Sequence, residues 1–364
     1  MSDNTMLQYK CPNCGGAIEF DSNTQKLKCP YCDTEFDVET LRGFDDGLKS
    51  TADNTPDWGE YRSDSGNGDW RDGETATMVS YICQSCGGEV IGDVNTAATV
   101  CPFCGNNVIV AQQFSGSLRP DYIIPFKIDK EKAKEALKNF MKGKKLLPDL
   151  FTEENRIDSI QGVYVPFWLF DADADAALSF KATKVTCWSD RDFDYTKTDY
   201  YQLLRSGKIA FDRVPVDGST KMDNKYMESL EPYDYNELVE FGTPYLAGYL
   251  ADKYDVDANE SMPRANERIK NSTVAAFRST TQGYSSCTPT GSKIDLSNHN
   301  IRYALLPVWL LNTKYKDQIY TFAMNGQTGK FIGKLPIDRS KYWKYWGLVF
   351  GAATVIGLII SFLL

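Results

Sequence analysis

The chain has 364 residues, with 40 Lys and Arg against 49 Asp and Glu, so its formal net charge is −9. This length is sufficient for two or three domains, and the acidic balance argues against nucleic-acid binding through general positive charge. Because no apolar leader opens the sequence, we expect the bulk of the chain in the cytosol, where ten cysteines indicate metal ligands before disulfides.

One cysteine pattern occurs twice in the first 104 residues. Each copy has two CxxC motifs with fourteen residues between them, and the copies are offset by seventy-two positions. The first copy is Cys11, Cys14, Cys29 and Cys32 in residues 1–41, and the second is Cys83, Cys86, Cys101 and Cys104 in residues 79–119. Two such motifs deliver four thiolates to one tetrahedral ion. The spacing therefore predicts two zinc ribbons, with an iron–sulfur or rubredoxin-like iron site as the alternative.

With four protein ligands each, both predicted sites are closed to water, so we expect two structural Zn²⁺ ions per chain. The ribbons are too small to fold on a hydrophobic core alone, so the metal must stabilise them. Glycines after Cys14, Cys86 and Cys104 suit tight turns around the metal. Hairpin turns are expected at Asp21-Ser-Asn-Thr and Asp93-Val-Asn-Thr.

The charge of the ribbons bears on their partners. Residues 1–41 have three lysines against seven acids, and residues 79–119 have Arg119 against Glu89 and Asp93. Phosphate binding needs a basic surface, which is lacking here. We therefore expect the ribbons to contact proteins and not nucleic acid.

The segment between the ribbons, residues 42–78, has nine acids against four bases and is expected to be a flexible linker. It nevertheless contains Trp58, Tyr61 and Trp70. Either these rings cover apolar surface of a neighbouring domain, or they form a motif that binds a partner.

From about Pro120 the sequence is typical of a folded α+β domain, which we assign to residues 120–337. A strand is expected at Asp121–Ile128. Asp129 then caps a helix that Gly143 closes. Its apolar face is Ala133, Ala136, Leu137, Phe140 and Met141.

The middle of this domain mixes strands and helices. Tyr164–Phe170 is an apolar run of β-formers that leads into an alternating Asp-Ala segment. A hairpin is expected over 200–216 with its turn at Ser206-Gly207. Helices are expected from Thr243 to about Tyr254 and from about Pro263 to Arg278. The second buries one side, which carries Ala265, Ile269 and Phe277.

Near the end of the chain, Leu306–Leu311 repeats the sequence pattern of Val165–Phe170, which is Xaa-Pro-Xaa-Trp-Leu-Xaa. A hairpin follows, with strands Tyr315–Met324 and Lys330–Leu335 and a turn at Asn325-Gly326. We interpret this as a weak internal repeat. The predicted fold class is α+β with a mainly antiparallel sheet.

Nothing in the sequence assembles a catalytic site. His299 is the one histidine and lies in a polar segment, so a solvated side chain is expected. Asp171, Asp173 and Asp175 lack the glycine and glutamate of a calcium loop and fit one face of a strand. Cys187 and Cys287 have no CxxC partner and are interpreted as core cysteines. No P-loop motif occurs.

The last nineteen residues, 346–364, carry no charge and would span roughly 28 Å as a helix, about one bilayer core. The basic residues before them are Lys330, Lys334, Arg339, Lys341 and Lys344, and an aromatic belt at the junction consists of Tyr342, Trp343, Tyr345 and Trp346. Residues 338–345 therefore resemble a headgroup-level flank, and the positive-inside rule predicts a single-pass tail anchor with a cytosolic body. Gly347 and Gly351 form a GxxxG pattern, so a homo-oligomer is an open alternative.

Several of these features together resemble a known family. They are the doubled ribbons, the terminal apolar helix and the segments Ile124-Pro-Phe126, Tyr164–Trp168, Pro244–Gly248, Leu306–Trp309 and Asn325–Lys330. The combination resembles bacterial TFIIB-type zinc-ribbon proteins, also labelled primosomal-helicase-like, over nearly the whole chain. The resemblance implies membrane-stress systems and partners of the phage-shock-protein-A-like or SPFH (flotillin-like) type. The helicase label implies motor motifs that this sequence lacks.

We therefore predict a non-enzymatic zinc-ribbon adaptor that is tethered to the cell membrane and recruits or scaffolds cytosolic proteins there, with a role in envelope stress. The alternative is a nucleic-acid-associated factor of replication or transcription held at the membrane. The charge of the ribbons favours the adaptor.

Overall fold

The computed structural model describes residues 19–21, 26–28, 35–36, 58, 61, 69–71, 73–93, 100–106, 109–113, 118–316 and 318–363. Their architecture is α+β, as predicted. The chain forms two compact units. The first, here called the arm unit, comprises Met1–Gly59, Phe170–Val214 and Met262–Asn300; the second, the central unit, comprises Glu60–Leu169, Pro215–Ser261 and Ile301–Leu364.

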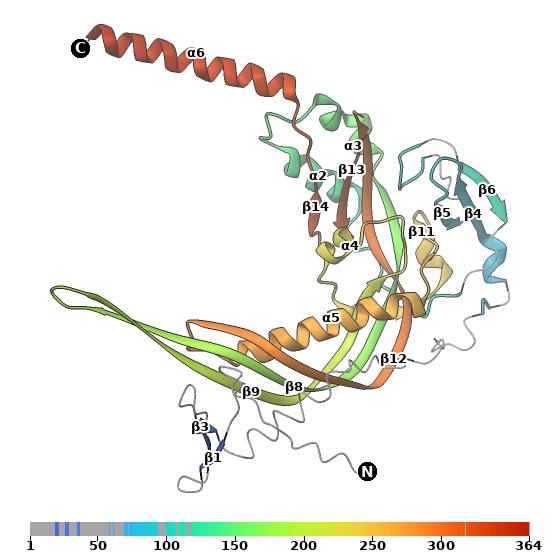
Figure 1. Ribbon diagram of the computed structural model, residues 1–364. Coiled ribbons are helices and arrows are strands. Elements are labelled where there is room, and N and C mark those ends of the chain that lie inside the picture. The colour runs from blue at the N-terminus through green and yellow to red at the C-terminus, as the bar shows by residue number, and fades with distance from the viewer. Residues whose placement is uncertain are drawn as a thin grey trace, which may run out of the picture. The chain divides into compact units, whose positions relative to one another are not determined.

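One large sheet contains most of the strands (Figure 1). Its order is β10 (Val239–Glu240), β7 (Tyr122–Ile123), β12 (Ser286–Tyr315), β8 (Gln161–Ser189), β11 (Leu250–Asp252), β5 (Glu89–Asp93), β4 (Met78–Cys83) and β6 (Ile109–Gln113). In addition, β13 (Gln318–Asn325) pairs with β12, β14 (Phe331–Gly333) pairs with β13, and β9 (Asp194–Asp217) pairs with β8. The pairings are mainly antiparallel, as predicted, with parallel contacts of β11 to β8 and of β12 to β7.

The apolar runs of β8 and β12 lie in the central unit, where both sheet faces are covered. Val308 and Leu310 point into one buried cluster with Phe167 and Leu169, against α4 (Asn224–Leu230). Trp309 belongs to the other cluster, with residues of α2 (Lys130–Met141) and α3 (Glu154–Asp158). Strands buried on both faces read as continuous apolar runs, which explains why both repeat segments lack alternation.

Helix α2 confirms its prediction. The Asp129 side chain accepts a hydrogen bond from the Lys132 backbone N–H at 2.8 Å, and Gly143 follows the helix with φ of 79°. The expected face buries Ala133, Leu137 and Met141. The described residues of this unit also form short 3₁₀ segments: η1 (Glu74–Thr77), η2 (Asp149–Thr152), η3 (Tyr235–Glu237) and η4 (Thr243–Leu246).

In the arm unit, α5 (Ala258–Ser279) lies along the long strands β8, β9 and β12 (Figure 1). Phe277 of α5 packs with Leu178, Phe180 and Leu203 of the strands. The alanines between Asp171, Asp173 and Asp175 are buried, which confirms the one-face interpretation of these aspartates. Ala265, Ile269 and Phe277 are buried as predicted.

The three linker aromatics cover apolar surface, the first of the two alternatives. Trp58 is buried, 5.1 Å from the Phe170 ring, and its Nε1 donates to Asn266 Oδ1 at 2.8 Å. Tyr61 packs 5.0 Å from Trp168. Trp70 packs 5.8 Å from Phe241. Each contact lies within one unit.

One predicted turn is wrong. Residues 200–216 form no hairpin at Ser206-Gly207, because β9 is continuous from Asp194 to Asp217. The chain reverses earlier, where the Asp190 N–H donates to the Phe193 carbonyl at 2.9 Å. Gly207 lies inside β9, and a Cβ there would lie 3.5 Å from the Phe277 ring, an ordinary van der Waals contact.

Two element boundaries also differ. The helix expected from Thr243 to Tyr254 is one 3₁₀ turn, η4, because Gly248 adopts φ of 80° and the chain then enters β11. The strand expected at Asp121–Ile128 is paired only at Tyr122–Ile123. Pro125 has no backbone N–H to continue a ladder, and Lys127 and Ile128 both donate to the Gly326 carbonyl instead.

The predicted C-terminal hairpin is present. β13 pairs with β14 at Met324↔Phe331 and Phe322↔Gly333, so the segment from Asn325 forms the turn between them. A separate small sheet, β1 (Glu19–Asp21), β2 (Lys26–Lys28) and β3 (Glu35–Phe36), pairs Asp21 with Lys26 and confirms the first cysteine-region hairpin. In the second region, β5 pairs with β4 and β11, and residues 94–99 lie outside the described residues, so the turn expected at Asp93-Val-Asn-Thr stays a prediction.

A buried ion pair joins η1 to the sheet. Arg119 is 1 % exposed, and its Nε donates to Glu74 Oε2 at 2.9 Å while Nη2 donates to the Phe241 carbonyl at 2.8 Å. Burial, the largest influence, raises the pKa of Glu74, but hydrogen bonds from Arg119 and the Arg71 N–H outweigh it, and the pKa lies below its ordinary value.

We expect Glu74→Ala to lower the free energy of unfolding by about 3 kcal/mol at pH 7, because it leaves the Arg119 charge buried and unpaired. The Glu74 contribution is complete above the unfolded pKa of about 4.3 and is lost as pH falls through the lower folded pKa. The difference between variant and wild type should therefore shrink on acidification, which urea titrations between pH 7 and 3 measure. Glu240→Ala, which removes the exposed partner of Arg71, is the control and should cost less than about 1 kcal/mol. Equal losses in the two variants would contradict the assignment.

Candidate metal centre

The second cysteine set comes together at one end of β4. Cys83 is the last residue of β4, Cys86 lies in the turn before β5, and Cys101 and Cys104 lie in a second turn. Their four sulfur atoms all lie within 4.8 Å of one another. These four cysteines form a cluster that could hold a metal ion.

The two CxxC turns have the same backbone geometry. Gly87 donates its N–H to the Cys83 carbonyl and Gly105 donates to the Cys101 carbonyl, both at 2.9 Å. The two glycines have φ of 66° and 71°, the left-handed region that favours glycine. The predicted role of the glycines after Cys86 and Cys104 is confirmed.

Sulfur spacing fits a tetrahedral ion. Cys83 Sγ lies 3.6 Å from Cys104 Sγ, and Cys86 Sγ lies 3.7 Å from Cys101 Sγ. A metal about 2.3 Å from each of four sulfurs places the sulfurs about 3.8 Å apart, which is longer than any disulfide. The residues present therefore fit a metal held by four thiolates.

Electrostatics at the cluster also favour a cation. Burial, the largest influence, raises the pKa of the Cys83 thiol, but backbone N–H groups of Cys86 and Ser85 outweigh it and lower the pKa to about 7. Burial raises the pKa of Cys101 above its ordinary value. Several thiolates crowded into a partly buried site need a bound positive charge to offset their repulsion and desolvation.

The cluster is packed into the central core. Cys83, Cys101 and Phe103 belong to the same buried cluster as Phe167 of β8. Asn312 of β12 donates from Nδ2 to the Pro102 carbonyl at 2.5 Å. β5 also pairs with β11, so residues on both sides of position 120 share one sheet. The domain boundaries of the sequence analysis stay predictions.

The first cysteine set, Cys11, Cys14, Cys29 and Cys32, lies outside the described residues. The small sheet of β1, β2 and β3 falls between and after these cysteines in the sequence. Its pairing supports the expected hairpin and leaves the second metal site a prediction.

Comparison with known proteins gives one relative of nearly full length. The chain is 35 % identical over 359 residues to "Uncharacterized protein YdjG" of Bacillus subtilis (strain 168), covering 99 % of this chain and 98 % of the relative. The chain belongs to the YdjG family. No family model matches it, and no solved structure matches it. The resemblance to TFIIB-type zinc-ribbon proteins stays a prediction.

The second feature of this YdjG-family chain is its C-terminal helix, α6 (Arg339–Leu363). Residues Arg339–Phe362 are long and apolar enough to cross a membrane, with mean hydropathy of 1.9 over their most apolar window and none of that window buried. Asp338 begins the helix, since its Oδ1 accepts hydrogen bonds from the Ser340 N–H at 2.8 Å and the Ser340 hydroxyl at 2.7 Å. The flanking rings of Tyr342 and Trp343 are exposed.

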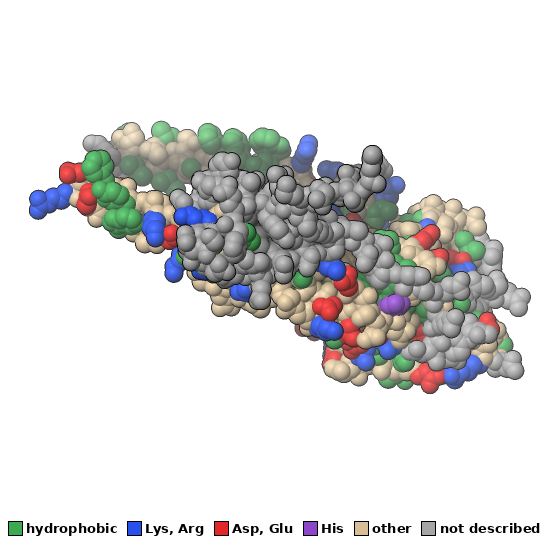
Figure 2. All heavy atoms as spheres, turned by 60° about the horizontal axis from the view of Figure 1, so that its bottom comes forward, with side chains coloured by type: hydrophobic (Ala, Val, Ile, Leu, Met, Phe, Trp, Pro, Cys, Tyr) green, Lys and Arg blue, Asp and Glu red, His purple; other side chains and the backbone are tan. Residues whose placement is uncertain are grey.

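Other candidate residues of the YdjG-family chain fall in the arm unit. His299 is exposed, as expected, although it lies in β12 and not in a turn; Figure 2 shows it in purple at the surface. Cys287 is half-buried and accepts a hydrogen bond from Thr281 Oγ1 at 3.2 Å. Cys187 is exposed, so its interpretation as a core cysteine is wrong. It lies near the end of β8, beyond the part of the strand that α5 covers.

Sequence reasoning missed an exposed aromatic group at the end of the β8–β9 hairpin (Figure 2). The rings of Trp188 and Tyr195 stack with centroids 5.4 Å apart, and Trp188 is 50 % and Phe193 66 % exposed. Asp190 fixes the turn, because its carboxylate accepts from the N–H groups of Asp192 and Phe193 and from the Tyr195 hydroxyl. We call Trp188, Phe193 and Tyr195 the aromatic tip. The sequence pattern that could have predicted this group is three aromatic residues around an Asp-rich turn.

Proposed function

We propose that this YdjG-family protein is a non-enzymatic adaptor, tethered to the cell membrane by α6, that presents cytosolic surfaces to protein partners. The observation that carries the proposal is α6, an apolar helix with no buried residue in its most apolar window. A soluble protein buries such a helix in its core, whereas a bilayer solvates it on every side. The basic and aromatic residues around its start favour a cytosolic body.

The metal is proposed to be structural zinc, two ions per chain. The sulfur distances of 3.6 and 3.7 Å at the second cluster support a tetrahedral ion. Four protein ligands leave no position for substrate or water, so the site supports folding and not catalysis. The first set, Cys11, Cys14, Cys29 and Cys32, is proposed to bind the second ion on the basis of its identical spacing.

The aromatic tip is the surface that we propose for partner contact. Stacked, exposed rings on a hydrogen-bonded turn lose little conformational freedom on binding, and aromatic side chains dominate the energetics of protein interfaces. Membrane-stress proteins of the phage-shock-protein-A-like or SPFH type, implied by the family resemblance, are the proposed partner class.

A nucleic-acid role is not proposed for the second cysteine region. Its one basic residue, Arg119, is buried and paired with Glu74, so it is withheld from phosphate. Salt-sensitive binding of DNA by the purified protein at micromolar or better affinity would overturn this choice.

The tagged full chain is purified from its native membranes in mild detergent, and the partner proteins that are recovered with it are measured. The double variant Trp188→Ser/Phe193→Ser should lose the specific partners that wild type recovers. We expect recovery to fall about ten-fold or more, the range typical of interface aromatics. Tyr245→Ser combined with Ile319→Ser, which changes exposed apolar residues of the central unit, is the matched control and should recover the same partners as wild type. If the tip variant keeps every partner while its metal content is unchanged, the tip is not the contact surface.

A further inference from the structure

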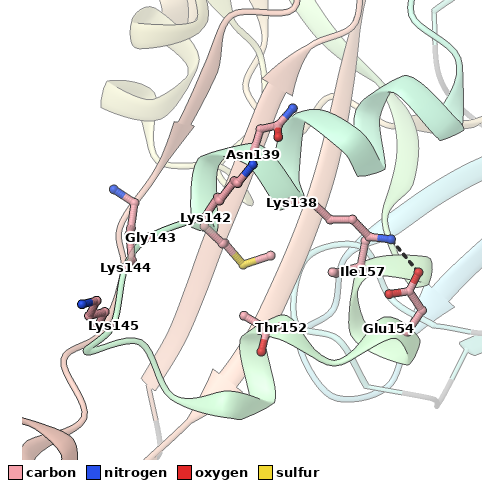
Figure 3. Close-up of a pocket in the computed structure, with 10 residues that line it drawn as sticks. Lys138, Asn139, Lys142, Gly143, Lys144, Lys145, Thr152, Glu154 and Ile157 are labelled. Atoms are coloured by element: carbon pink, nitrogen blue, oxygen red, sulfur yellow. Dashed lines mark hydrogen bonds and ion pairs between the residues drawn. The ribbon is translucent and has the colours of Figure 1, made fainter.

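The loop that follows α2 carries an exposed cluster of positive charge. Lys142, Lys144 and Lys145 are all exposed, and together with α2 and α3 residues they line an open cavity of about 550 Å³. Figure 3 shows the amino groups of Lys144 and Lys145 on the same side of the loop. We call these three lysines the basic loop.

These charges are not neutralised within the part of the chain that the structure describes. Lys138, one turn earlier, pairs with Glu154 at 2.6 Å, and Lys341 pairs with Asp149 at 2.5 Å. None of the three basic-loop lysines has a carboxylate within 4.0 Å among the described residues. Lys144 lies over the Phe140 ring at 4.9 Å, a contact that holds the side chain and leaves its charge exposed to solvent.

Hydrogen bonds hold the basic loop beside the start of α6. The Asp338 backbone N–H donates to the Leu146 carbonyl at 2.8 Å, and Lys341 Nζ donates to the Leu147 carbonyl at 2.8 Å. Leu146 directly follows Lys145, and Lys341 lies in the first turn of α6. These hydrogen bonds therefore hold the basic loop in space beside the first turn of α6.

From this position we infer that the basic loop binds the phosphate headgroups of anionic phospholipids in the bilayer that α6 crosses. The inference rests on the proposed membrane anchoring. A helix that crosses the bilayer begins at headgroup level, so the carbonyls of Leu146 and Leu147 lie there too. Arg339 and Lys344 are exposed at the same level and extend the positive surface, while Trp343 provides an interfacial ring.

The expected strength follows from the number of charges. Each lysine near an anionic membrane surface contributes a factor of about five in binding, and the effect is lost with added salt. Three lysines therefore favour anionic over zwitterionic headgroups on the order of a hundred-fold at low ionic strength. The loop would hold the central unit against the membrane and make its orientation depend on lipid charge.

The test measures which lipids stay with the full-length protein. Wild type, Lys142→Gln/Lys144→Gln/Lys145→Gln and a charge-matched control, Lys130→Gln/Lys132→Gln/Lys225→Gln, are equilibrated in mild detergent micelles with equal amounts of phosphatidylglycerol and phosphatidylcholine. Each protein is captured, and its bound lipids are extracted and quantified. The control lysines are exposed on the first turn of α2 and on α4, away from the basic loop in the sequence.

We expect wild type and the control to enrich phosphatidylglycerol, and the basic-loop variant to lose about ten-fold or more of that enrichment. Equal enrichment in all three proteins would overturn the inference. Displacement of phosphatidylglycerol by millimolar inorganic phosphate would also overturn it, since the site would then select free phosphate. Failure of the membrane proposal is distinguishable, because then none of the proteins retains lipid of either kind. Unchanged metal content in every variant verifies that the fold is intact.

Discussion

Replacing Cys83 and Cys86 by serine should remove one metal ion per chain and destabilise the sheet around β4 and β5. The loss follows because two of four thiolates are gone and the remaining pair cannot complete a tetrahedral site. Structural zinc contributes about 10–16 kcal/mol of apparent binding free energy to small zinc modules at neutral pH, more than the net stability of most domains. Because Cys83, Cys101 and Phe103 pack with Phe167, the damage should reach the central core.

Elemental analysis of the purified full chain measures the metal directly, and thermal unfolding measures the consequence. Wild type should contain two zinc ions, and the double variant one. Cys187→Ser is the control, since this exposed cysteine lies outside the cluster and its loss should leave both ions in place. Cys11→Ser should lose the other ion and keep that of the second cluster. Iron in place of zinc, or no change in the double variant, would contradict the assignment.

Deleting 346–364 should move the protein from the membrane fraction to the soluble fraction while its metal content and folded core are retained. The core should survive because no part of the most apolar window of α6 is buried against the rest of the described chain. Adaptor activity should be lost, because tethering raises the effective concentration of each surface at the bilayer and deletion returns it to bulk dilution. Cell fractionation and partner recovery measure the two effects.

An unrelated membrane helix of similar length, placed after residue 345, is the matched control for this deletion. It should restore both membrane association and partner recovery if the helix acts as a simple tether. Failure of the foreign helix would show that the native helix makes a specific contact, for which Gly347 and Gly351 are the available close-packing positions. A fully active protein without any membrane helix would exclude the adaptor proposal.

Local signals predicted the elements that depend on nearby residues. Helix α2 has an Asp cap, an apolar face and a closing glycine within fifteen positions, from Asp129 to Gly143, and each acts within its own turn. The four second-set cysteines were likewise predictable, because two CxxC motifs at matched spacing constrain the chain geometry. The apolar helix α6 followed from composition alone.

Features that depend on contacts between residues distant in the sequence were predicted wrongly or missed. Gly207 looked like a turn residue, but it lies within β9 and next to Phe277, seventy positions later in the sequence. The attachment of the second metal centre to β12 depends on Asn312 and Pro102, which are 210 positions apart. A single sequence carries no local sign of either contact. Exposure of the aromatic tip likewise depends on where α5 ends over the strands.

The division of the arm unit into Met1–Gly59, Phe170–Val214 and Met262–Asn300 has a consequence for the order in which the protein matures during translation. Strands β8 and β9 leave the ribosome well before β12, which begins only at Ser286, and β12 lies next to β8 in the sheet. Until β12 emerges, one edge of β8 and its apolar side chains stay exposed, and such exposed edges and side chains promote aggregation. The nascent chain should therefore depend on chaperones until residues beyond Asn300 emerge, and neither unit can be produced alone as one continuous gene fragment.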